Sequence, residues 1–252
     1  MAAGRGAKGG RRNGPKSGGR GATGGRGRSA APRSRPAKPP RTADADAPPV
    51  PPLAPSGPFR LGAVAGTTPG KWIDIWHERM PETPLELIAL EVAGQRDALA
   101  TAAVDAALVR LPIDRDGLHV IPLYDEVPVV VCAADSHLTA ADELNVDDLE
   151  GEVVIVPRDS VVDVDVPGAE PAAFDAPATT EEAIATVAAG VGVVIVPMSL
   201  ARLHHRKDAE YRPLAGGPLS TVALAWSADD VSGGVATFIG IVRGRTPNSS
   251  RG

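Results

Sequence analysis

Short blocks of hydrophobic residues recur from Phe59 towards the end of the chain, and their spacing alternates between strand-like and helix-like periods. A period of two, or a short continuous apolar run, is typical of a strand, whereas apolar residues at i, i+3, i+4 and i+7 are typical of a helix. Strands separated by short helices indicate βαβ units and a parallel sheet. The expected strands are 59–65, 85–92, 105–111, 118–123, 127–133, 153–156, 172–175, 193–196, 211–214 and 221–226, and the expected helices are 69–80, 95–104, 180–190, 199–205 and 231–245, with helical turns at 146–149.

The most regular stretch is Thr179–His205, where helix, glycine turn, strand and second helix follow one another. Thr179 and Glu182 have the spacing of a capping box, which predicts a helix start near Thr180. The apolar residues 193–196 fit a strand that is buried on both faces of a parallel sheet. Helix N-termini attract anions, so the two helix starts are candidate anion sites. A well-packed αβα unit without any site explains the same pattern.

Residues 1–58 have a different composition from the rest of the chain. They contain twelve Lys or Arg, two Asp, twelve Gly and eleven Pro, whereas the remaining residues carry a formal charge of −15. A segment so poor in apolar side chains cannot offset its ordering entropy by burial, so it is predicted to be a disordered basic tail. Its arginines can contact nucleic-acid phosphates without reading sequence. The alternative is a solubilising extension, or one that arises from an upstream start codon.

The chain shows neither a secretory signal nor a membrane span. The charged start is not followed by an apolar h-region, and glycines interrupt the most apolar run, near 187–198. Cys132 is the single cysteine, so no disulfide can form within the chain. These features predict a cytoplasmic protein that does not contact a membrane.

The globular part resembles the effector-binding (substrate-binding) domain of LysR-type transcriptional regulators. The matching stretches are RLGAVAGTTPGKW at 60–72, VDAALVRLPIDRDGLHVIPLYDEVPVVVCAADSHL at 104–138, ATVAAGVGVVIVP at 185–197 and VATFIGIVRGRT at 235–246. Each motif is degenerate, but their order and spacing are specific, and together they cover essentially all of 59–252.

The resemblance implies a type 2 periplasmic-binding-protein fold, in which two α/β lobes are joined by two crossing strands. The crossings are expected near Val129–Ala133 and Thr221–Ala225. Lobe one then comprises 59–131 and 221–246, lobe two comprises 132–220, and 247–252 form a frayed end.

The resemblance also implies that a small effector, often a carboxylate, binds in the cleft between the lobes. Loop hydroxyls and helix N-terminal amides suit such an anion on physical grounds. Thr68 and Thr179 have ordinary helix capping as their alternative role, and Arg110 and Arg158 have surface ion pairing. The residues carried over as ligand-binding candidates are Thr67, Thr68, Arg110, Arg158, Thr179, Met198 and Ser199.

The sequence departs from the family at its N-terminus. LysR-type regulators carry a winged helix-turn-helix and a linker helix there, and residues 1–58 have the apolar periodicity of neither. Sequence-specific DNA binding is therefore not carried over. The two alternatives for DNA contact are the charges of the tail and a partner regulator that supplies the DNA-reading domain. Homodimerisation is a further expectation from the family.

Enzyme signatures are not apparent in the sequence. The five histidines are scattered, and no zinc spacing, nucleophile elbow or P-loop occurs. Cys132 lies within an apolar run, which favours an inert core residue. We therefore expect no catalysis, no metal and no cofactor. The leading interpretation is an effector sensor in transcriptional regulation, and the alternatives are a protein-interaction module with a vestigial cleft and a transporter's solute-binding protein.

Overall fold

The computed structural model describes residues 57–230 and 232–244, all within one compact unit. Nearly all of the predicted basic tail and the predicted frayed end at 247–252 lie outside the described residues.

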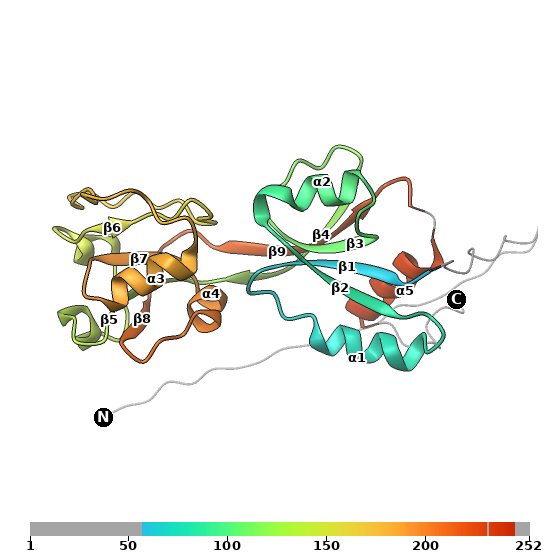
Figure 1. Ribbon diagram of the computed structural model, residues 1–252, viewed down its shortest axis with the longest axis horizontal. Helices are drawn as coiled ribbons and strands as arrows, with labels where there is room; N and C mark the ends of the chain where they lie inside the picture. The colour runs from blue at the N-terminus through green and yellow to red at the C-terminus, as the bar shows by residue number, and fades with distance from the viewer. Residues whose placement is uncertain (1–56, 231, 245–252) are drawn as a thin grey trace, which may run out of the picture. The chain divides into compact units, whose positions relative to one another are not determined.

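The described chain folds into alternating strands and helices (Figure 1). In order they are β1 (Phe59–Val64), α1 (Gly70–Arg79), β2 (Leu85–Leu90), η1 (Val92–Gly94), α2 (Gln95–Ala100), β3 (Ala106–Arg110), β4 (Leu118–Glu126), β5 (Pro128–Ala133), η2 (His137–Ala140), η3 (Val146–Leu149), β6 (Val154–Ile155), α3 (Thr180–Ala188), β7 (Val193–Pro197), α4 (Met198–Leu203), β8 (Ala209–Pro213), β9 (Ser220–Ser227) and α5 (Gly233–Val242).

The first sheet has the strand order β2-β1-β3-β9-β4, with β1, β2 and β3 parallel and β9 antiparallel to both of its neighbours. Figure 1 shows α1 and α5 against one face of this sheet and α2 against the other. Side chains of β3 alternate between the two faces, as the period of a strand requires. Ala106 and Leu108 pack with Phe59, Trp76 and Phe238, while Ala107 and Val109 pack on the α2 side.

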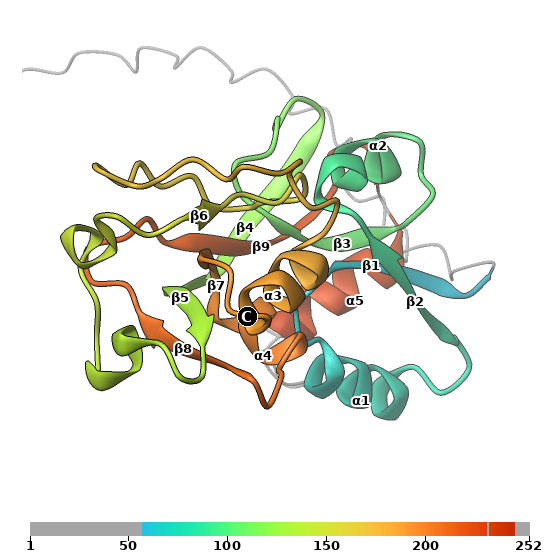
Figure 2. The same ribbon diagram turned by 60° about the vertical axis from the view of Figure 1, so that its left-hand side comes forward.

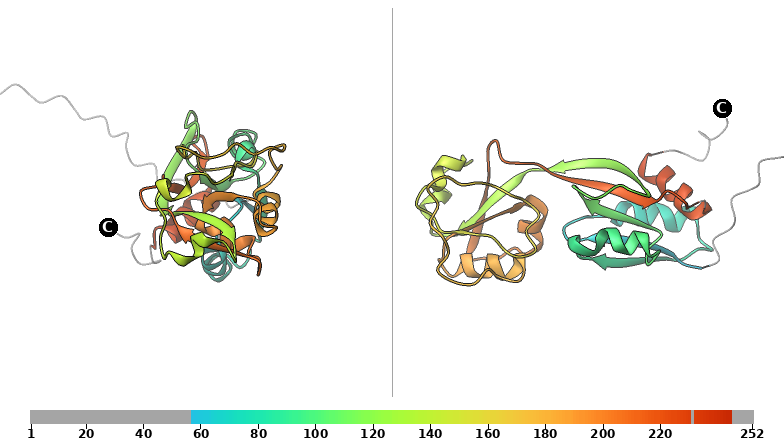
Figure 3. Two further views of the ribbon diagram at one scale, coloured as in Figure 1. Left: turned by 90° about the vertical axis from the view of Figure 1, so that its left-hand side faces the viewer. Right: turned by 90° about the horizontal axis from the view of Figure 1, so that it is seen from above.

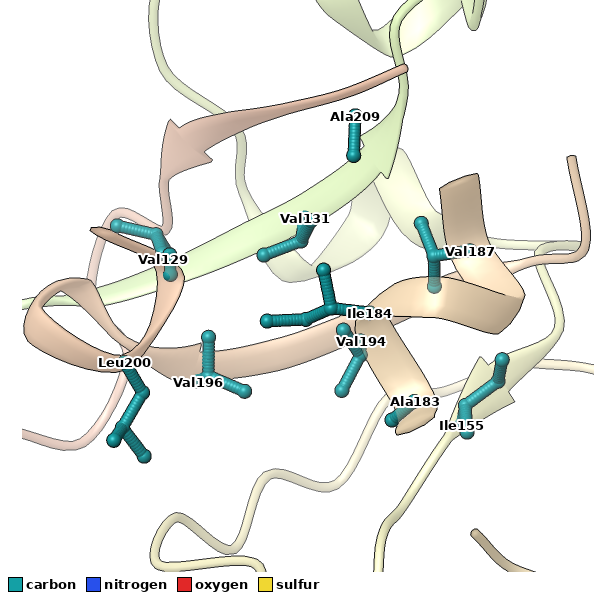
Figure 4. Close-up of a cluster of buried hydrophobic side chains, with 11 residues drawn as sticks. Val129, Val131, Ile155, Ala183, Ile184, Val187, Val194, Val196, Leu200 and Ala209 are labelled. Atoms are coloured by element: carbon teal, nitrogen blue, oxygen red, sulfur yellow. The ribbon is translucent and has the colours of Figure 1, made fainter. Parts of the chain in front are cut away.

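The second sheet has the order β6-β7-β5-β8. Val129 and Val131 of β5 face the core beneath α3, and Ile184 of α3 belongs to the same cluster of buried side chains (Figure 4). Val130 and Cys132 face the opposite core, which includes η3. The expectation of a parallel sheet around 193–196 is wrong in part, because β7 is parallel to β6 but antiparallel to β5. Burial on both faces, which suggested the parallel sheet, comes here from α3 on one side and the 137–166 segment on the other.

Two short segments connect the sheets. Val127 alone separates β4 in the first sheet from β5 in the second. Residues 214–219 lead from β8 in the second sheet back to β9 in the first. The chain can be traced between the two sheets in Figures 2 and 3. The expected first crossing at Val129–Ala133 is therefore displaced, because those residues pair with β7 and β8 inside the second sheet. Thr221–Ala225 likewise lie inside the first sheet, paired with β3 and β4.

Several predicted element ends differ from the structure. Thr68 does not cap α1: Pro69 occupies the N-cap position, and no side chain caps the helix. Ser199 lies within α4, whose N-cap is Pro197. The helix expected at 95–104 ends at Ala100, because Ala102 adopts a left-handed conformation and the chain closes the helix there. Residues 172–175, which are among the described residues, do not form the expected strand. Just before them, Glu170 forms an isolated β-bridge with Val153.

Candidate functional site

A pocket of about 530 Å³ lies where the chain passes between the two sheets. Three segments line it: the β1–α1 loop, the end of β4, and α4 with its neighbours. The lining residues are Gly66, Thr67, Thr68, Tyr124, Asp125, Glu126, Val127, Met198, Ser199, Arg202 and Leu203. The first sheet and its loop thus supply one part of the wall, and the helix that follows the second sheet's β7 supplies another.

Gly66 allows the β1–α1 loop to approach α4 closely. It has a φ of +83°, a conformation that side-chain-bearing residues rarely adopt. A Cβ at this position would lie 2.5 Å from Ser199 Oγ and 3.0 Å from Arg110 Nη2. The close approach of this loop to α4 therefore requires glycine.

A buried ion pair forms the back of the pocket. Arg110, at the end of β3, is 2% exposed, and its Nη1 lies 2.8 Å from Oε2 of Glu126, at the end of β4. Nη1 also donates to Ser220 Oγ at 2.9 Å, and Nη2 donates to Ala65 O at 3.2 Å and to Ser199 Oγ at 3.0 Å. The Ser199 hydroxyl donates in turn to Glu126 Oε2 at 2.7 Å. The terminal nitrogens of a guanidinium carry four hydrogens, and all four are used here.

Gln95 holds the backbone of Arg110 in place. Its amide nitrogen donates to Arg110 O and its amide oxygen accepts from Arg110 N, both at 2.9 Å. Gln95 is buried at the start of α2. Because a buried charge without partners is very costly, this surrounding network explains how Arg110 can be buried at all. The alternative expectation for Arg110, a surface ion pair, is wrong because the side chain is buried.

Thr67 and Thr68 differ in how their hydroxyls are used. Thr67 Oγ1 donates to Val64 O at 2.7 Å within the loop. Thr68 is exposed in the pocket wall, and among the described residues no hydrogen bond of its hydroxyl is found. Thr68 lies just before α1. The first backbone hydrogen bonds of this helix run from the amides of Trp72 and Ile73 to Pro69 O. The earlier amides of this helix lack an intrahelical acceptor, as at every helix start.

Two further side chains shape the electrostatics of the wall. Arg202 supplies a cation one helical turn after Ser199, and its Nε lies 3.4 Å from the hydroxyl of Tyr211. The pKa of Tyr124 is raised, mainly by desolvation and further by the negative charge of Glu126. Tyr124 therefore stays protonated and can donate a hydrogen bond at ordinary pH.

The structure brings together five of the seven residues expected at the site. Thr67, Thr68, Met198 and Ser199 line the pocket, and Arg110 lies directly behind them. Arg158 and Thr179 do not line it. The guanidinium of Arg158 donates to Ala176 O at 3.2 Å, and Thr179 caps α3 by accepting from Glu182 N at 3.2 Å, the alternative role considered for it.

Sequence reasoning missed the end of β4 and the later part of α4. Tyr124, Asp125, Glu126 and Val127 line the pocket but were not among the candidates, because the first crossing was expected at Val129–Ala133, just after them. Arg202 had a detectable signal, since it lies three residues after Ser199 and residues three apart share a helix face.

Metal and thiol chemistry find no support in the described part of the chain. Within 57–230 and 232–244, no three His, Cys, Asp or Glu side chains are grouped as metal ligands. Cys132 is buried, and desolvation raises the pKa of its thiol, which disfavours a reactive thiolate.

Comparison with known proteins decides the family. Residues 54–247 match the family described as "LysR substrate binding domain". The chain belongs to this family. The prediction from the resemblance is thereby confirmed, and so is the type 2 periplasmic-binding-protein-like fold.

Two regulators are similar in sequence to this LysR substrate-binding domain. The Hca operon transcriptional activator HcaR of Escherichia coli K12 is 26% identical over 187 residues, covering 69% of this chain and 62% of HcaR. The HTH-type transcriptional regulator CatR of Pseudomonas putida is 31% identical over 161 residues, covering 60% and 55% respectively. The chain thus spans about three fifths of the length of these curated relatives.

Solved structures show the same fold. The reduced form of the OxyR regulatory domain from Pseudomonas aeruginosa is similar at a TM-score of 0.59 and 26% identity, covering 74% of this chain and 97% of that one. The BenM effector-binding domain with its effector benzoate is similar at a TM-score of 0.61 and 20% identity, covering 75% of this chain and 91% of that one.

None of the helices among the described residues has both the length and the apolar character that a membrane span requires.

Proposed function

We propose that this domain senses a small anionic effector, which binds in the pocket between the two sheets and serves transcriptional regulation. The observation that carries the proposal is the composition of the pocket wall: Thr68 comes from the first sheet's β1–α1 loop, whereas Met198 and Arg202 come from α4, next to the second sheet. A ligand that contacts both the β1–α1 loop and α4 favours one relative position of the two sheets over others.

The anionic end of the effector is assigned to the side of the pocket near Thr68 and Arg202. The hydroxyl of Thr68 is available as a donor, and it stands beside the start of α1, where free amides and the helix dipole favour negative charge. Arg202, from α4, adds a full positive charge to the pocket lining.

We propose binding rather than catalysis as the activity of this pocket. HcaR and CatR are named as transcriptional regulators, and BenM as a protein with an effector-binding domain. The carboxylate of Glu126 is held by Arg110 and Ser199, which suits a structural acceptor better than a proton carrier.

Thermal unfolding of the full chain against a panel of small carboxylates, amino acids and sugar acids tests the proposal. Benzoate, the effector of BenM, belongs in the panel. A ligand at a hundredfold excess over its Kd stabilises the folded state by about 2.7 kcal/mol, which corresponds to a rise in Tm of roughly 5–10 °C. We expect a saturable rise for at least one anion, and a flat response across the panel would contradict the proposal.

Replacing Thr68 by Val locates the site. Because the Thr68 hydroxyl is free for a ligand, Thr68→Val is expected to weaken binding of the stabilising anion about tenfold with little change in the Tm of the free protein. Thr67→Val is the matched control, since its hydroxyl already serves Val64 O. It is expected to lower the stability by about 1 kcal/mol and to change the affinity less. Equal affinity losses in both variants would argue against Thr68 as the group that binds the anion.

A further inference from the structure

The pocket already contains a carboxylate of its own at the place where the sequence predicts that an effector's carboxylate binds. Glu126 Oε2 accepts from Arg110 Nη1 at 2.8 Å and from Ser199 Oγ at 2.7 Å. Arg110 and Ser199 were expected to bind the effector, and both give their donors to Glu126 instead. The remaining terminal hydrogens of Arg110 go to Ser220, Ala65 O and Ser199.

A second carboxylate would gain little at this position. It would have to displace Glu126 from Arg110, and separating a buried ion pair leaves one charge without its partner, at a cost of several kcal/mol. It would also stand beside the charge of Glu126 and be repelled by it. The back of the pocket therefore does not favour an anionic group.

The second oxygen of Glu126 remains available as an acceptor. Among the described residues, no hydrogen bond to Oε1 is found, and no buried side-chain oxygen or nitrogen lacks a partner. Oε1 is therefore accessible, although the side chain as a whole is only 9% exposed. The charge of Glu126 also contributes to the raised pKa of Tyr124 in the same wall. An accessible acceptor with negative charge suits a cationic donor from the ligand.

We propose that the effector is an aminocarboxylate, whose ammonium group donates to Glu126 Oε1 and whose carboxylate lies towards Thr68 and Arg202. This inference rests on the proposed function, because it takes the same pocket as the effector site. Val127, Met198 and Leu203 line the pocket as well, and they suit an apolar body between the two charged ends.

Binding of matched ligands to the full chain, measured by calorimetry, tests the inference. One series consists of 4-methylbenzoate, 4-(aminomethyl)benzoate and 4-methylbenzylamine, and a second of valerate, 5-aminovalerate and pentylamine. Within a series the molecules have similar bodies and differ in which charged end they carry. A charge-assisted hydrogen bond to Glu126 predicts that, in at least one series, the aminocarboxylate binds about tenfold or more tightly than the plain carboxylate.

The outcomes separate this inference from the proposed function. A carboxylate that binds as tightly as its amino counterpart would overturn the inference and leave the anion site intact. An amine that binds as tightly as the aminocarboxylate would support the hydrogen bond to Glu126 and contradict the anionic end of the proposed function. Binding by no member of either series would contradict the proposed function and the inference together.

Two variants connect the preference to Glu126. Glu126→Gln keeps the shape and one oxygen for Arg110 and Ser199, but it replaces the accessible acceptor by an amide donor. We expect the preference for the aminocarboxylate to fall about tenfold or more in this variant. Asp125→Asn is the comparison variant, because Asp125 is the other carboxylate that lines the pocket, and one of its oxygens accepts from Thr221 Oγ1 at 2.6 Å. The assignment to Glu126 predicts that the preference falls much less in this variant than in Glu126→Gln.

An unchanged preference in Glu126→Gln, or an equal fall in Asp125→Asn, would overturn the assignment to Glu126. Circular dichroism and the Tm of each variant establish that it is folded. If Glu126→Gln does not fold, the matched series on the wild-type chain still decides the inference.

Discussion

Single residues define the pocket wall, and Gly66 is the clearest case. Its left-handed conformation and its lack of a side chain bring the β1–α1 loop against Ser199 and Arg110. Arg110 is in turn buried with Glu126. A small change at Gly66 therefore acts on a charged, closely packed group of side chains.

Replacing Gly66 by Ala is expected to destabilise the domain by about 1–3 kcal/mol, because the backbone becomes strained and the new methyl group meets Ser199 and Arg110. Unfolding in urea measures the change. Gly70→Ala is the control, since Gly70 begins α1 and an added Cβ there would have no neighbour within 4 Å apart from adjacent residues and the backbone of its own helix. It should be neutral or stabilising by up to about 1 kcal/mol. Equal stability of the two variants would contradict the close approach seen at Gly66.

Secondary-structure elements show which features the sequence predicts well. Strands such as β3 and β7 follow from their apolar runs, and α3 follows from its N-cap Thr179 and its apolar face. The crossing between sheets did not follow, because 127–133 is one continuous apolar run. A strand's sheet is fixed by the partners it pairs with, and these come from distant parts of the chain.

The site was predictable only in part for the same reason. Loop hydroxyls and residues after strands could be placed at the cleft, and Thr68 and Met198 are found there. That Arg110 and Ser199 meet Glu126 depends on three distant segments, and no local pattern brings those positions together.

The helix α3 provides a prediction at the scale of an element. Thr179 caps it, and neither Thr179 nor the helix lines the pocket. Thr179→Ala should therefore lower the free energy of unfolding by about 1 kcal/mol and leave effector affinity within about twofold. Urea unfolding and calorimetry measure the two quantities. A loss of affinity without a loss of stability would place Thr179 in the binding site.

At the scale of the whole molecule, the chain combines an acidic domain with the basic segment 1–58. We predict that any DNA binding by the full chain is electrostatic, without sequence preference, and decreases steeply with salt. Neutralisation of six phosphates would reduce the affinity about 10³-fold between 50 and 200 mM salt.

Replacing the segment's first arginines by Gln, in the full chain, should weaken this binding. The slope of log affinity against log salt should become shallower by up to about 0.9 for each phosphate that is no longer neutralised. The positions are Arg5, Arg11, Arg12, Arg20, Arg26 and Arg28. Fluorescence anisotropy on two unrelated duplexes measures both effects. Strong preference for one duplex, or binding that these substitutions leave unchanged, would contradict the prediction.

The central claim is that the pocket beside α4 is the effector site, and methyl NMR tests it most directly. The chain has three methionines, of which Met198 lines the pocket while Met80 packs against the core of the first sheet. The chain is labelled at the methionine methyl groups and titrated with the anion that most raises its Tm, and Met198→Leu assigns the pocket signal. We predict that the Met198 signal shifts saturably while the Met80 signal stays in place. A stabilising ligand that leaves the Met198 signal unshifted would contradict this account.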